Sequence, residues 1–284
     1  MTDSDIVLTG PKGRARAGRA HVISTTTRWI GVLMALAVLG GATLDYFSST
    51  GRLGDSQDLV LAGLTLVPLP VAALILWVAR SLAKGMVRDQ WMMFGLGMLS
   101  VGVGNVIFIA LYLASGTDPY PSIADASTLA GYALFAVGLF KAIRAYRGLL
   151  NVRQPMLIAA GVSAAVMTLV YFAVIGPYVI FAEDHSMSFA LRFFNTLYPM
   201  LDVFILLMPA ITLGLLVSRL GAGRVAWPWW FVVGSASILA VVDTVFAYAG
   251  YTGLGRTPII DAGYALAPLA LGFASLVARD IYNS

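Results

Sequence analysis

Residues 91–114 decide the fold class of this chain, because the stretch WMMFGLGMLSVGVGNVIFIALYLA contains no charged residue. A transmembrane helix needs about 20 mostly apolar residues to cross the roughly 30 Å hydrocarbon core of a bilayer. Inside that core every backbone amide must be hydrogen-bonded within the protein, so a long apolar stretch without alternating polarity predicts a helix rather than a barrel strand. We therefore expect residues 91–114 to span a membrane.

Seven further stretches have the same apolar character. Together they predict eight spans, near residues 29–47, 59–80, 91–114, 125–143, 156–176, 196–218, 228–250 and 259–278. The sequence thus predicts an all-α integral membrane protein with eight transmembrane helices in a single domain over residues 28–279. A disordered basic cytoplasmic tail is expected at residues 1–27, and a short cytoplasmic tail at residues 280–284.

The composition supports the same class. Of the 284 residues, 59% are hydrophobic and 11% are charged, whereas a soluble domain carries roughly 25% charged residues. The absence of cysteine excludes disulfides, thiolate metal sites and cysteine nucleophiles. The two histidines, His21 and His185, are too few for a three-histidine zinc site.

The basic residues predict the orientation of the spans, because cytoplasmic loops are rich in Lys and Arg. With the N-terminus inside, the cytoplasmic side holds 15 of the 18 Lys and Arg residues, and the other side holds Arg52, Arg192 and Arg256. We therefore expect a plasma-membrane protein with both termini in the cytoplasm. The net charge of +4 then reflects membrane topology and contact with lipids, and no nucleic-acid partner is predicted.

An internal repeat is visible along the chain. Residues 105–140 and 243–277 each begin with Asn or Asp, continue with Phe three residues later, and then contain a Gly-containing loop, a Pro and an Asp. Residues 198–216 repeat the second half of this pattern. The shared Pro and Asp pairs are Pro121 with Asp125, Pro199 with Asp202, and Pro258 with Asp261. The pattern predicts four parallel helical-hairpin repeats.

The repeat places polar residues at one depth, near the exterior. A rise of 1.5 Å per residue puts Asp45, Asn105 and Asp243 roughly 20–25 Å along their helices. Asp125 and Asp261 open the descending helices, and Asp202 lies slightly deeper. Because a charge in hydrocarbon costs about 2.5–3.5 kcal/mol on insertion scales, these side chains should face the bundle interior or a water-filled vestibule. The predicted ligand-binding set is Asp45, Asn105, Asp125, Asp202, Asp243, Asp261, Arg192, Arg256 and Tyr198.

Structural explanations exist for several polar and aromatic residues. Asp58, Asp125 and Asp261 would be good partners for a helix N-terminus, and Asn105 would form an interhelical hydrogen bond. The glycines of residues 95–105 predict a close helix-packing surface rather than a nucleotide loop. The tryptophans near the cytoplasmic ends predict an interfacial belt, formed by Trp29, Trp91, Trp227, Trp229 and Trp230. The tyrosines expected near the vestibule are Tyr171, Tyr198, Tyr248 and Tyr264.

The sequence lacks several enzyme signatures. Its three lysines, Lys12, Lys84 and Lys141, all lie on the cytoplasmic side, which excludes a mid-membrane Schiff base for retinal. The G-x-S-x-G, H-E-x-x-H and Walker patterns and the paired Asp-rich motifs of prenyltransferases are absent. A non-enzymatic role without a cofactor is therefore favoured. A metal site built from Asp45, Asp125, Asp202, Asp243 and Asp261 would require these carboxylates to converge in space, and this alternative stays open.

Three strings carry a resemblance to a known family: PSIADASTLAGYALFAVGL at 121–139, YPMLDVFILLMPAITL at 198–213 and DTVFAYAGYTGLGRTPIIDAGYAL at 243–266. In this order and spacing they resemble the multi-span N-terminal membrane sensory region of bacterial, actinobacterial-type GGDEF/EAL cyclic-di-GMP signalling proteins, over about residues 100–278. In that family the last span leads into a cytoplasmic catalytic domain. Here only residues 280–284 follow Arg279, and GGDEF and EAL motifs are absent, so the resemblance implies a sensing module without cyclase or phosphodiesterase activity.

The first hypothesis is therefore a stand-alone membrane sensor. It would bind a small-molecule or lipid ligand in an outward-facing acidic vestibule and signal to a cytoplasmic protein. A proton-coupled transporter of a small solute is an alternative, although the inner halves of the spans are mostly Ala, Leu, Val and Gly. A metal-assisted enzyme acting on lipid head groups is a further alternative.

Overall fold

The computed structural model describes residues 23–49, 63–117, 119–148, 150–181, 188–220, 224–252 and 257–283. Within these ranges the chain forms helices and turns and contains no strand. Most of the predicted N-terminal tail lies outside the described residues, but helix α2 already begins at Thr25, inside the predicted tail. Asp58 and Arg256 also lie outside the described residues.

Eight helical stretches of the described chain are long and apolar enough to cross a membrane. The structure therefore confirms an all-α, multi-pass membrane protein with eight candidate spans. The helices are α2 (Thr25–Ser49), α4 (Pro68–Ser81), α5 (Met86–Ser115), α6 (Ala124–Arg147), α7 (Arg153–Val170), η2 (Tyr171–Ile180), α8 (Phe189–Leu201), η3 (Asp202–Leu207), α9 (Met208–Ser218), η4 (Arg224–Ala226), α10 (Trp227–Thr252) and α11 (Pro258–Tyr282).

The sixth span differs most from its predicted bounds. It was expected at 196–218 but begins at Phe189, where the side chain of Ser188 caps the helix by accepting a hydrogen bond from Leu191 N at 3.2 Å. Pro199 lies inside this span and is followed by the wider π-helical turns of η3. Such turns accommodate a proline because they offer the backbone groups that it frees other partners. Asp202 therefore lies in the middle of a long span, not close to its start.

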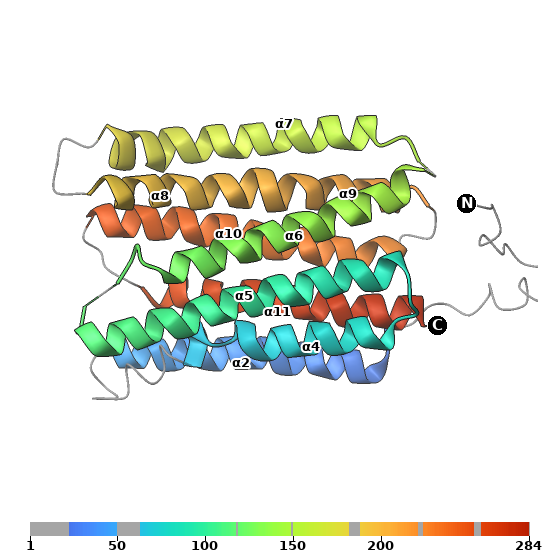
Figure 1. Ribbon diagram of the computed structural model, residues 1–284, viewed down its shortest axis with the longest axis horizontal. Helices are drawn as coiled ribbons and strands as arrows, with labels where there is room; N and C mark the ends of the chain where they lie inside the picture. Colours follow the sequence, from blue (N-terminus) through green and yellow to red (C-terminus); the bar gives the residue numbers. More distant parts are fainter. Residues whose placement is uncertain are drawn as a thin grey trace, which may run out of the picture.

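The helices lie side by side along the long axis of the molecule (Figure 1). α5 packs between α4 and α6, α10 packs against α11, and α7 packs against α9. α2 differs from the expected hairpin arrangement, because its main contacts are with α11 rather than with α4. The described chain begins and ends at the same end of the bundle, where Ser24 N donates to Asp280 Oδ2 at 2.8 Å.

Four glycines of α5 form two pairs, and the members of each pair are seven residues apart. Gly95 and Gly102 lie against leucine side chains near α4, namely Leu76 and Leu69. Gly97 and Gly104 lie against the backbone of α6: an added Cβ would be 3.0 Å from Gly131 O and 2.9 Å from Ala124 O, respectively. The predicted close-packing role of this stretch is therefore confirmed, and the missing side chains allow α5 to touch both neighbours.

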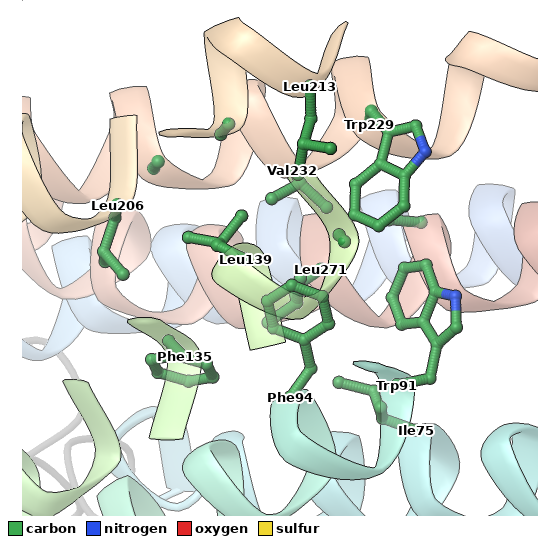
Figure 2. Close-up of a cluster of buried hydrophobic side chains, with 14 of the residues drawn as sticks. Ile75, Trp91, Phe94, Phe135, Leu139, Leu206, Leu213, Trp229, Val232 and Leu271 are labelled. Carbon is green, nitrogen blue, oxygen red and sulfur yellow. The ribbon is translucent and has the colours of Figure 1, made fainter. Parts of the chain in front are cut away.

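The largest core cluster lies between the helices, and Figure 2 shows part of it. Trp91 and Trp229 are fully buried there and stack with their ring centroids 6.0 Å apart. The predicted interfacial belt is therefore wrong for these two residues, because they face inward from α5 and α10. Trp29, Trp227 and Trp230 are exposed on the described surface, as belt residues would be.

Candidate functional site

A cavity of about 250 Å³ lies between α5, α6, α8, α10 and α11. Its apolar part is formed by side chains of the core cluster, including Phe94, Phe135, Leu139 and Leu271. Its polar part includes Asp125 in the first turn of α6 and Tyr264 in the second turn of α11. Both helices begin at the end of the bundle opposite the termini, so the polar part lies towards that end (Figure 1).

Three tyrosine–aspartate hydrogen bonds join different helices around this cavity. Each tyrosine hydroxyl donates to a carboxylate oxygen on another helical segment. The pairs are Tyr198 of α8 with Asp125 of α6 at 2.6 Å, Tyr132 of α6 with Asp202 of η3 at 2.5 Å, and Tyr264 of α11 with Asp243 of α10 at 2.6 Å. Short hydrogen bonds thus connect the fourth span to the sixth and the seventh span to the eighth.

Two of the carboxyl groups also contact each other. Asp202 is fully buried, and its side chain is in hydrogen-bonding contact with Asp243. Oδ2 of Asp202 receives no N–H or O–H from any other described residue. Because neither carboxylate has a hydrogen of its own, the contact becomes a hydrogen bond only when one of the two groups carries a proton.

Asp125 has a structural role and also borders the cavity. One of its oxygens accepts the backbone N–H of Ser122 at 2.7 Å, as expected for an acidic residue in the first turn of a helix. Its other oxygen accepts the hydroxyl of Tyr198 and helps to line the cavity. The capping explanation and the site explanation therefore both apply to this residue.

Two asparagines complete the polar wall. Asn105 Nδ2 donates to Thr65 O at 2.6 Å, which confirms the predicted interhelical hydrogen bond. Asn195 Oδ1 accepts from the hydroxyl of Tyr120 at 3.0 Å. Asn105, Tyr120 and Asn195 all line the cavity.

The structure brings together part of the predicted ligand-binding set. Four of its members line the cavity: Asn105, Asp125, Tyr198 and Asp243. Asp202 lies behind Asp243 and is not part of the lining. The ligand-binding role of these residues remains a prediction.

The other predicted members lie elsewhere. Asp261 is buried in the first turn of α11, and Arg192 is partly buried in α8, but neither lines the cavity. Asp45 belongs to α2, and its side chain lies outside the described residues, as does Arg256. Among the tyrosines expected near the vestibule, Tyr198 and Tyr264 line the cavity, whereas Tyr171 and Tyr248 do not.

Sequence reasoning missed Tyr120, Tyr132 and Asn195. A signal for Tyr132 was present, because it follows Asp125 by seven residues and so lies on the same helix face two turns further along. A buried tyrosine hydroxyl needs a hydrogen-bonding partner, which makes a carboxylate in an adjacent apolar span a natural candidate. Tyr120 lies just before α6, and Asn195 lies in the part of α8 that precedes the predicted start of the sixth span at residue 196.

Within the described ranges, no three His, Cys, Asp or Glu side chains gather closely enough to hold a metal ion. The carboxyl groups of the site are instead engaged by tyrosines. Comparison of the chain with protein-family models, curated proteins and solved structures finds no match.

Proposed function

We propose that the protein is a membrane sensor that binds a small-molecule or lipid ligand in this cavity and signals to a cytoplasmic protein. One observation carries the proposal: a mainly apolar cavity is bordered by carboxyl groups from two helices, and each carboxyl group is held by a tyrosine from a third or fourth helix. Ligand pockets commonly combine apolar walls with a few convergent polar groups.

The hydrogen bonds offer a way to convert binding into helix movement. A ligand that competes for Asp125 or Asp243 would weaken bonds between α6 and α8 or between α10 and α11. These helices extend to the opposite end of the bundle, where basic residues flank them, including Arg147, Arg153 and Arg279. The resemblance to membrane sensory regions supports placing a cytoplasmic partner at that end.

The transporter alternative is less well supported. A transport path must continue through the molecule, but the cavity-lining ring of Phe94 packs against the buried side chains of Trp91 and Trp229. The metal-assisted enzyme is also less well supported, because the described residues do not provide three clustered carboxylates.

A thermal-stability screen in lipid nanodiscs tests the proposed function. A ligand that binds the folded state raises the midpoint of unfolding by mass action. We expect a subset of small amphipathic compounds to stabilise the wild type, and Asp243→Asn to lose that response while keeping its folded yield. Asp89→Asn is the matched control, because Asp89 is exposed at the far end of α5. The proposal fails if no compound stabilises the wild type, or if both variants respond alike.

A further inference from the structure

The tyrosine hydroxyls at the cavity have already donated their hydrogens. A tyrosine hydroxyl has one hydrogen and can also accept. In the described structure each tyrosine hydroxyl of the lining donates to one side chain: Tyr120 to Asn195, Tyr132 to Asp202, Tyr198 to Asp125 and Tyr264 to Asp243. These hydroxyls therefore have no hydrogen left to donate to a ligand, unless a protein hydrogen bond breaks.

Other polar groups of the lining follow the same pattern. Ser235 Oγ donates to Ala267 O at 2.7 Å, and Thr128 Oγ1 donates to Ala124 O at 3.4 Å. Asn105 directs one amide hydrogen to Thr65 O. The donors of the polar wall with no protein acceptor assigned are thus amide hydrogens of Asn105 and Asn195. The carboxylate, hydroxyl and carbonyl oxygens outnumber them, so the wall favours a ligand that brings donors of its own.

The charged residues of the lining also favour a ligand that carries hydrogen-bond donors, because they are acidic. Asp125 and Asp243 both line the cavity, and the described lining contains no Lys, Arg or His. A negative charge away from water is unfavourable unless an opposite charge compensates it.

The apolar walls also suit a cation. Eight of the lining residues are Phe or Tyr, and four of them come from the same end of the bundle as the polar part of the cavity: Phe108, Tyr120, Phe246 and Tyr264. The face of an aromatic ring attracts a positive charge, and aromatic cages recognise organic ammonium groups in this way. Two independent features of the wall, its acceptors and its rings, thus select the same ligand chemistry.

We propose that the cavity binds an organic ammonium compound, with its charged nitrogen between Asp125 and Asp243 and its apolar body against the core-facing aromatic side chains. This inference rests on the proposed ligand-binding function and specifies the chemical class of the ligand.

Three probes of similar size and different charge test the ligand class: 2-phenylethylammonium, 2-phenylethanol and 3-phenylpropanoate. Binding to the full-length protein is measured by calorimetry in nanodiscs of zwitterionic lipid, so that the bilayer itself does not attract the cation. We expect the ammonium compound to bind at least ~10-fold more tightly than the alcohol, because it gains charged hydrogen bonds and cation–π contacts. We expect the carboxylate to bind most weakly.

Variants then assign the preference to the proposed carboxyl groups. Asp125→Asn and Asp243→Asn should each reduce the ammonium-to-alcohol affinity ratio by ~10-fold, since Asn keeps an acceptor for the tyrosine but lacks the charge. Asp89→Asn should leave the ratio as in the wild type. An unchanged ratio in both cavity variants would overturn the inference.

The outcomes for the wild type separate this inference from the proposed function. If the alcohol or the carboxylate binds as tightly as the ammonium compound, the cavity is a binding site but the proposed ligand class is wrong. If none of the three probes binds, both the ligand class and the proposed function are overturned. The wild-type series decides the inference even if a cavity variant does not fold.

Discussion

Tyr132 and Asp202 form the shortest of the hydrogen bonds at the site, at 2.5 Å, and both side chains are buried. We expect Tyr132→Phe to lower the free energy of unfolding by about 1–3 kcal/mol, because it leaves a buried carboxylate oxygen without its donor. The measurement is denaturant unfolding in bicelles. Tyr112→Phe is the control, since the Tyr112 hydroxyl makes no hydrogen bond with a described side chain. Equal losses in the two variants would show that the bond contributes little.

The contacts of Asp202 with Tyr132 and Asp243 make a separate prediction. In Asp202→Asn the amide can still accept from Tyr132 and can donate to Asp243, so the free energy of unfolding should stay within about 1 kcal/mol of the wild-type value. Asp202→Leu has a similar size but leaves the Tyr132 hydroxyl and Asp243 without this partner, and it should lose about 2 kcal/mol or more. The same unfolding assay compares them. Equal losses of stability in the Asn and Leu variants would show that the polar contacts of Asp202 contribute little.

The candidate site was only partly predictable from single residues. Asp125 and Asp243 stand out because a carboxyl group in an apolar span is costly and must face the protein interior. The pairing of Tyr132 with Asp202 depends on α6 lying beside η3, and residues 70 positions apart carry no local signal of that contact. Arg192 and Arg256 were predicted only because their charge is opposite to that of the aspartates. Charge alone does not indicate which side chains lie close together in space.

Among the elements, the α5–α6 pair gives the sharpest packing prediction. A Cβ at Gly131 would lie 2.9 Å from Gly97 O, so Gly131→Ala must push two backbones apart. We expect it to lower the free energy of unfolding by about 1–3 kcal/mol, as overpacking of a close contact does. Gly161→Ala in α7 is the matched control, because an added Cβ there meets no atom within 4 Å. The close-contact explanation fails if both substitutions have the same effect.

The helices themselves were largely predictable, because span length and apolar character are local properties of the sequence. The main error concerns the start of the sixth span. The span was expected from residue 196, whereas the helix begins at Phe189, continues through Pro199 and widens at Asp202. A proline indicates that one backbone hydrogen bond is lost, but the sequence does not say whether π-helical turns will accommodate it.

For the whole molecule, the proposed orientation can be tested on a single helix, because the chain has no cysteine. Ser115 is the exposed last residue of α5, and Lys84 is exposed just before its start. In intact cells we expect a membrane-impermeant maleimide to label Ser115→Cys at once, and to label Lys84→Cys only after permeabilisation. The opposite pattern would place the polar end of the cavity in the cytoplasm.

The packing of α2 against α11 has a consequence for how the protein is made. The ribosome synthesises α2 first among the described helices and its main partner, α11, last. During translation α2 is therefore surrounded by lipid until α11 is inserted. The exposed leucine and valine side chains of α2 are compatible with that environment. Final assembly of this side of the bundle is consequently a late step, and a chain interrupted before α11 would leave α2 without its main docking surface.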